Sequence, residues 1–220
     1  DLIWSYTTGG APLNFAHTFK DLVFDWENNL YAVGGHTGLD AGITVAKFDT
    51  TGGLIWGDNP PGIFVPTSVA VAKFTESMYV AHDFGVEKLD SSNGRTIWNL
   101  DTFDVRPEHC DLDDDENLYV AGQRKGAPLS AGVVKYDSDR NLLWHRSMAG
   151  FAPITISGLS VTRDAKHVFV GDISGNRVFA IDSTKFDRFS GSIPRPLYVE
   201  GFPLPIGAEV TDVQAGFPFE

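Results

Sequence analysis

This 220-residue sequence has little cysteine, no long apolar run and few basic side chains. Its single cysteine, Cys110, excludes an internal disulfide framework. No stretch of 18 apolar residues occurs, so no transmembrane helix is predicted and we expect no membrane insertion. The 17 basic residues stand against 29 acidic ones, a net charge of −12. Because an acidic surface repels phosphate backbones, we expect no nucleic acid partner and interpret the charge as favouring solubility.

A repeated strand–turn–strand motif that ends in tryptophan is what the sequence does contain. The motif occurs in AKFDTTGGLIW, EKLDSSNGRTIW and VKYDSDRNLLW, and an initial DLIW repeats its end. The tryptophans are Trp4, Trp56, Trp98 and Trp144, at spacings of 52, 42 and 46 residues. A period of about 40 to 50 residues is the size of one four-stranded propeller blade.

Alternating apolar runs upstream of each tryptophan complete a unit of four strands. The expected units are 21–56, 68–98, 110–144 and 158–199. In the first unit the expected strands are 21–25, 29–34, 43–49 and 54–56. The sequence therefore predicts an all-β fold: a β-propeller of four-stranded antiparallel blades, with about four complete blades plus partial ones. The core should consist of apolar residues on the second and third strands: Leu30, Val33, Val45, Phe48, Tyr79, Val80, Leu118, Val120, Val134, Val168, Val170 and Val178.

The two ends of the sequence carry partial blades. We expect a lone strand at 2–4 and another at 209–215, while 196–199 completes the fourth unit with Tyr198 in the tryptophan position. Unpaired strand edges promote association with other chains. We therefore expect residues 1–220 to form a propeller domain or a large fragment of one, completed by further chain or capped by a neighbouring subunit.

An aspartate opens the turn before each tryptophan strand. Asp at this position can accept hydrogen bonds from backbone amides, and glycine accepts a positive φ without steric cost. Gly94 and the Gly52–Gly53 pair fit this role in the first two units. In the third unit either Arg140 or Asn141 must take it, and we favour Asn141 because asparagine tolerates the left-handed region.

The pattern xDxxxGxxxW after a strand resembles the PQQ-like (pyrroloquinoline-quinone-type) β-propeller repeat and related bacterial and phage repeats. The resemblance extends over residues 21–199 and implies the architecture. The quinone dehydrogenases of that family use a vicinal disulfide against the cofactor, together with a calcium site. Cys110 has no second cysteine to pair with, so we expect no quinone cofactor and do not transfer the redox activity.

The most acidic segment, CDLDDDEN, offers a possible calcium site. Asp111, Asp113 and Asp115 have the 1, 3, 5 spacing at which carboxylates converge on a hard cation. However, Glu116 and Gly122 stand where such a loop requires glycine and glutamate. We favour a solvated hairpin whose aspartates serve the turn, with calcium as the alternative and no other cofactor expected.

Four side chains follow the second strands of the four units at comparable places. They are His36, His82, Gln123 and Asp172. Because propeller loops meet near the central channel, these residues could form a ligand-binding site there. The alternative, that they are ordinary loop residues, is favoured because the six histidines include no pair with metal-ligand spacing.

Trp26 lies in a hairpin turn, outside the repeated tryptophan positions. Exposed tryptophans are frequent at the centres of protein interfaces, so Trp26 is the best candidate contact residue.

Two classes of function follow. The favoured one is a non-enzymatic interaction or scaffold module, a rigid surface that binds a protein partner or neighbouring subunits in an extracellular, periplasmic, envelope or virion assembly. The alternative is a propeller enzyme with a metal or ligand site at one end of the channel. The first is favoured because no acid–base pair, nucleophile or metal cluster can be recognised in the sequence.

Overall fold

The computed structural model describes residues 17–36, 42–58, 65–148, 154–185 and 200–203. In these ranges the chain forms strands, with one short 3-10 helix at Ser183–Lys185. None of the helical structure in these ranges is long and apolar enough to cross a membrane. The chain divides into two compact units, Asp1–Leu100 and Asp101–Glu220. We call these two parts the first and second unit, and we call the four-stranded repeats of the sequence sheets or blades.

Each unit contains two four-stranded sheets. The first sheet consists of β1 (His17–Phe24), β2 (Leu30–His36), β3 (Gly42–Phe48) and β4 (Leu54–Asp58). The second consists of β5 (Pro66–Val71), β6 (Ser77–His82), β7 (Gly85–Asp90) and β8 (Thr96–Leu100). The third consists of β9 (Val105–Leu112), β10 (Leu118–Arg124), β11 (Ala127–Tyr136) and β12 (Leu142–Ser147). The fourth consists of β13 (Ile156–Val161), β14 (His167–Asp172), β15 (Arg177–Asp182) and β16 (Glu200–Pro203).

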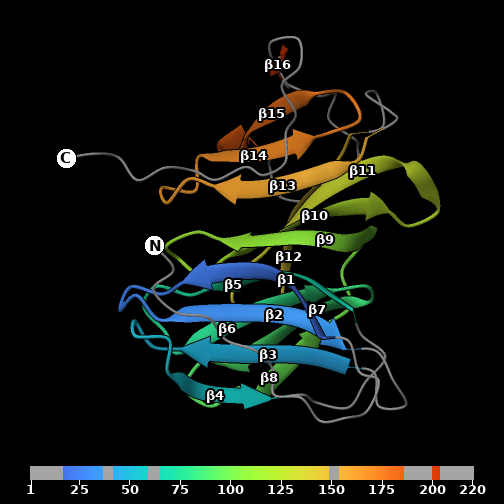
Figure 1. The fold of residues 1–220 in the computed structure, drawn as a ribbon. Coiled ribbons are helices and arrows are strands. Elements are labelled where there is room, and N and C mark those ends of the chain that lie inside the picture. Colours follow the sequence, from blue (N-terminus) through green and yellow to red (C-terminus); the bar gives the residue numbers. More distant parts are fainter. Residues whose placement is uncertain (1–16, 37–41, 59–64, 149–153, 186–199, 204–220) are drawn as a thin grey trace. The chain divides into compact units, whose positions relative to one another are not determined.

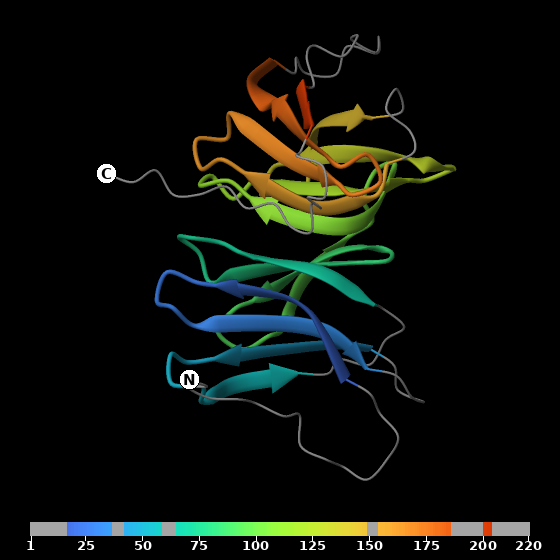
Figure 2. The same ribbon diagram turned by 45° about the horizontal axis from the view of Figure 1, so that its top comes forward.

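Every sheet is an antiparallel meander in which strands pair in chain order (Figure 1 and Figure 2). This is the construction of a propeller blade, and it confirms the predicted all-β, β-propeller fold class. Within the first unit β1 lies against β5, and within the second β9 lies against β13. Successive blades of a unit therefore pack through their first strands.

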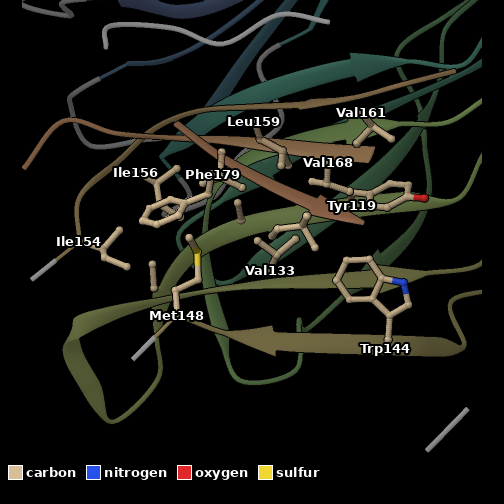
Figure 3. Packing of buried hydrophobic residues seen from close by; sticks show 14 residues of the cluster. Tyr119, Val133, Trp144, Met148, Ile154, Ile156, Leu159, Val161, Val168 and Phe179 are labelled. Atoms are coloured by element: carbon tan, nitrogen blue, oxygen red, sulfur yellow. The ribbon is translucent and has the colours of Figure 1, made fainter. Parts of the chain in front are cut away.

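The two units bury separate apolar cores. In the first unit, Tyr31, Val33 and Val45 pack with Val80 and Leu89 of the next sheet. The larger cluster of the second unit is drawn in Figure 3.

The predicted core is confirmed except at Leu30 and Val178, which are partly exposed. On β15 the fully buried residues are Phe179 and Ile181, and Val178 lies on the opposite face because strand side chains alternate.

The repeated tryptophans close a cross-strand row in each of the first three sheets. The paired rows are Tyr31–Lys47–Trp56, Tyr79–Lys88–Trp98 and Tyr119–Lys135–Trp144. In each row the tyrosine and tryptophan rings meet edge to face, with centroids 5.6 to 6.3 Å apart. Each lysine ammonium lies 4.7 to 5.1 Å from the tyrosine ring centroid. Trp56, Trp98 and Trp144 thus occupy equivalent places, as the repeat predicts.

Two predicted strand boundaries need correction. The segment 110–115 is not one strand, because β9 ends at Leu112 and the following aspartates form the turn. In the fourth sheet the described part of the last strand is Glu200–Pro203, and Glu200, not Tyr198, pairs with Ala180 in the tryptophan row. The predicted strand at 196–199 with Tyr198, like those at 2–4 and 209–215, lies outside the described residues.

The turn before β12 also departs from the prediction. Arg140, not Asn141, takes the positive φ, at 71°. Asn141 is needed one position later, where its backbone and side-chain N–H groups donate to the Asp137 carboxylate, each over 2.8 Å. Gly52 and Gly94 take the positive φ in the first unit, as expected.

Candidate functional site

A hydrogen-bonded cluster of four side chains recurs in the two units, and the sequence analysis missed it. In the first unit the Asp25 carboxylate accepts hydrogen bonds from Asn29 (2.8 Å from N, 2.9 Å from Nδ2) and from the Tyr31 hydroxyl (3.2 Å). Lys47 Nζ lies 3.6 Å from the same carboxylate. Although burial opposes ionisation of Asp25, the hydrogen bonds from Asn29 outweigh it and lower the pKa.

The second unit repeats the cluster with Asp113, Asn117, Tyr119 and Lys135. Asn117 donates to Asp113 over 2.8 to 3.0 Å, the Tyr119 hydroxyl donates over 3.0 Å, and Lys135 Nζ lies 3.2 Å away. The sequence signal was available: an aspartate followed by asparagine four residues later and tyrosine six residues later. We call these the first and second clusters.

These contacts place the acidic segment that suggested calcium. Asp113 is buried in the second cluster, and Asp115 donates its backbone N–H to Asp113. Asp111 instead accepts a hydrogen bond from the backbone N–H of Val161 on β13, over 2.7 Å. The hairpin that we favoured is present and Asp113 serves its turn, but Asp113 is buried rather than solvated, and Asp111 has a partner on the next blade. Calcium binding here remains a prediction, and among the residues described no three His, Cys, Asp or Glu side chains are grouped to hold a metal ion.

Asp111 takes part in a second recurring feature, a hydrogen-bonded contact between an aspartate on the first strand of one blade and the first strand of the next blade. In the first unit Asp21 on β1 accepts hydrogen bonds from Ser68 Oγ and Val69 N on β5, each over 2.8 Å. Asp111 makes a contact of the same kind from β9 to β13, two residues further along both strands. Burial of its carboxylate raises the pKa of Asp111 to about 6.

The four residues expected near the channel do not occupy one register. His82 and Asp172 are equivalent, since they pair with Pro66 and Ile156 at the start of their first strands. The equivalent positions in the other two sheets are Gly34 and Gly122, which pair with Phe19 and Pro107. His36 and Gln123 therefore lie two residues and one residue further along their strands. Ligand binding by this set remains a prediction.

His82 is buried at the end of β6. The backbone N–H of Phe84 donates to its Nδ1 over 3.2 Å. Burial lowers the pKa of His82 to about 4, so the imidazole is neutral at neutral pH.

Asp172 closes the hairpin between β14 and β15. Its carboxylate accepts hydrogen bonds from Ser174 Oγ over 2.6 Å and from Arg177 Nη2 over 2.7 Å, and it also accepts from the backbone N–H of Thr155. Burial opposes ionisation, but these donors outweigh it and lower the pKa of Asp172. Both equivalent residues thus have internal partners.

Trp26 is exposed, as predicted, and the structure adds two neighbours that the sequence did not indicate. Lys73 and Phe74 come from the β5–β6 turn, and Lys73 Nζ lies 4.6 Å from the Trp26 ring centroid and 4.7 Å from that of Phe74. Trp26 is 49% exposed and Phe74 is 72% exposed. We call these three residues the aromatic–lysine patch.

A pocket of about 280 Å³ lies beside the aromatic–lysine patch. Its floor includes the first cluster, through Asp25, Tyr31 and Lys47, and its rim includes Glu27 and Glu76. Ser91 borders it from the β7–β8 turn. Its carbonyl oxygen accepts the Trp56 indole N–H over 3.0 Å. The pocket is therefore made by turns from two blades of the first unit, and it combines a polar floor with exposed rings.

The strand order and pairing define the class of protein as a β-propeller. No protein-family model matches the sequence, and no curated protein matches it significantly. Among solved structures, the chain is similar to a chain of the nidogen/laminin complex, with a TM-score of 0.59 and 14% identity, over 77% of this chain and 62% of that one. It is also similar to a protein of unknown function from Bacteroides caccae, with a TM-score of 0.53 and 16% identity, over 70% and 54%. The chain thus spans less than two thirds of each, and similarity at these identities concerns the fold.

Proposed function

We propose that this chain is a non-enzymatic interaction and scaffold module of PQQ-like propeller repeats, which binds a protein partner through the aromatic–lysine patch. The observation that carries the proposal is the exposure of Trp26 and Phe74 side by side at the edge of a pocket. Tryptophan is enriched among residues that dominate binding energy, and clustered exposed apolar side chains mark interaction sites.

The pocket floor supports binding in preference to chemistry. Asp25 already accepts hydrogen bonds from Asn29 and Tyr31 and has an ammonium 3.6 Å away. A floor whose polar groups are held in this way is rigid before a partner arrives, so little side-chain entropy is lost on binding. The interaction role also agrees with the nidogen/laminin structure, in which a chain of similar fold is part of a complex.

Selection from a random peptide display library, with the whole chain as bait, tests the proposal. The selected peptides should bind the Trp26→Ala, Phe74→Ala double variant at least tenfold more weakly than the wild type, because truncating a hot-spot residue costs at least about 2 kcal/mol. The matched control is Phe84→Ala, Ile97→Ala, which removes two other exposed apolar side chains of the first unit. Equal binding to the wild type and both double variants would overturn the proposed surface.

A further inference from the structure

The aromatic–lysine patch already contains a bound cation, the ammonium of Lys73. Its distances of 4.6 and 4.7 Å to the two ring centroids lie within the range at which a ring face attracts a positive charge. The two rings are therefore placed to hold a cation, and the chain fills that place with its own side chain.

The fold does not require aromatic residues at these turns. The corresponding turns of the second unit have the same lengths, between Asp113 and Asn117 and between Thr162 and His167. Asp114 stands at the position of Trp26, and Asp164 at the position of Phe74. Since aspartate at both positions is compatible with the blade, the two rings of the first unit call for a reason other than folding.

Charge around the pocket favours a positive ligand. Glu27 and Glu76 are exposed on its rim, and Asp25 lies on its floor. Lys47 lies close to Asp25. Glu27 accepts a hydrogen bond from Asn29 Nδ2 over 3.3 Å. Both rim carboxylates line the same pocket as Lys73. The whole chain carries −12, so it also attracts basic partners over longer distances.

We infer that the pocket binds an arginine side chain from a basic segment of a protein partner. The guanidinium replaces the Lys73 ammonium over the Trp26 ring and donates hydrogen bonds to Glu27 or Glu76. Arginine fits better than lysine because its planar head stacks on aromatic rings and donates two parallel hydrogen bonds to one carboxylate. This inference rests on the proposed function and specifies the chemistry of the partner.

The probe is the capped peptide Gly-Arg-Gly-Arg-Gly-Arg-Gly, with the citrulline peptide of the same length as the neutral control. By calorimetry with the whole chain, the arginine peptide should bind at least fivefold more tightly than the citrulline peptide. Trp26→Ala and the double variant Glu27→Gln, Glu76→Gln should each weaken arginine-peptide binding about five- to tenfold. Asp114→Asn, which removes a charge from the corresponding turn of the second unit, should leave it unchanged.

Lys73→Ala sharpens the test, because it removes the internal competitor. Binding of the arginine peptide should become several-fold tighter, and this gain should disappear in the Trp26→Ala background, since the two residues act at one place. If citrulline binds equally well, or if Trp26→Ala has no effect on the arginine peptide, the inference is wrong. Display-selected peptides that lack basic residues but still require Trp26 and Phe74 would overturn the arginine while leaving the interaction surface in place.

Discussion

The first and second units contain the same four-residue cluster but bury it to different depths. The Asp25 side chain is 13% exposed and lines the pocket, whereas the Asp113 side chain is 0% exposed. The ion pair is also shorter in the second unit, 3.2 Å against 3.6 Å. The four-residue cluster therefore stabilises a hairpin in both units. In the first unit it also forms the floor of the pocket. The turn residues beside the clusters differ as well: Trp26 and Phe74 in the first unit stand where the second has Asp114 and Asp164.

Removing the cluster aspartates should give the largest difference in unfolding free energy between the two units. Asp113→Ala leaves a buried lysine without its carboxylate, and loss of one member of a buried pair costs about 3 to 5 kcal/mol. Asp25→Ala should cost only about 1 to 2 kcal/mol, because water entering the pocket can solvate Lys47 and Asn29. Urea unfolding followed by circular dichroism measures both free energies.

Asp113→Asn is the control for this pair of variants. It keeps an acceptor for the hydroxyl of Tyr119 but removes the charge. The loss of unfolding free energy in this variant therefore reports on the ion pair with Lys135. Equal losses in Asp25→Ala and Asp113→Ala would show that the depth of burial has no influence on the cluster.

His82 in the first unit and Asp111 in the second should make opposite contributions to the acid dependence of stability. His82 has a folded pKa of about 4 against an ordinary 6.5, so the unfolded chain binds the extra proton and stability is lost as the pH falls from 6.5 towards 4. Asp111 has a folded pKa of about 6 against an ordinary 3.8, so the folded chain binds the extra proton and stability is regained over about the same window.

Variants that cannot titrate separate the two effects. Between pH 7.5 and pH 5, the unfolding free energy of His82→Gln relative to the wild type should rise by about 2 kcal/mol, and that of Asp111→Asn should fall by about 1.4 kcal/mol. Urea midpoints at the two pH values give both differences. A change of the same sign in both variants would contradict the assignment of opposite protonation states.

The fold could be predicted from the sequence because each blade repeats local signals. The tryptophan that ends each motif, the alternating apolar strands and the aspartate at each turn are all visible as short-range spacing in the chain. The register of the last strand was wrongly predicted because the fourth sheet has no tryptophan to mark it. There Ala180 pairs with Glu200, where the other sheets pair lysine with tryptophan.

The candidate site was less predictable, because it depends on side chains that only the fold brings together. Trp26 was recognisable as a tryptophan outside the repeat, but Lys73 and Phe74 come from a different blade, 47 and 48 residues later. The surroundings of the acidic segment at 110–117 were wrongly predicted for the same reason. Asp111 and Asp113 lie two residues apart in sequence, yet one contacts the next blade and the other its own hairpin.

The smallest expected effect concerns the turn in which the units use different residues at a positive φ. Gly52 takes this conformation in the first unit at 85°, and Arg140 takes it in the second at 71°. A side chain in the left-handed region costs about 1 to 2 kcal/mol, which glycine avoids, although glycine also loses more entropy on folding. Arg140→Gly should therefore be more stable than Arg140→Ala by about 0.5 to 1 kcal/mol, a comparison that removes the arginine side chain from both variants.

Gly52→Ala is the reciprocal change and should lose about 1 kcal/mol, because it introduces into the first unit the strain that the second already contains. Urea unfolding of the three variants decides the outcome. If Arg140→Gly is no more stable than Arg140→Ala, the backbone at position 140 is not strained. The two units would then differ at this turn in residue type but not in energy.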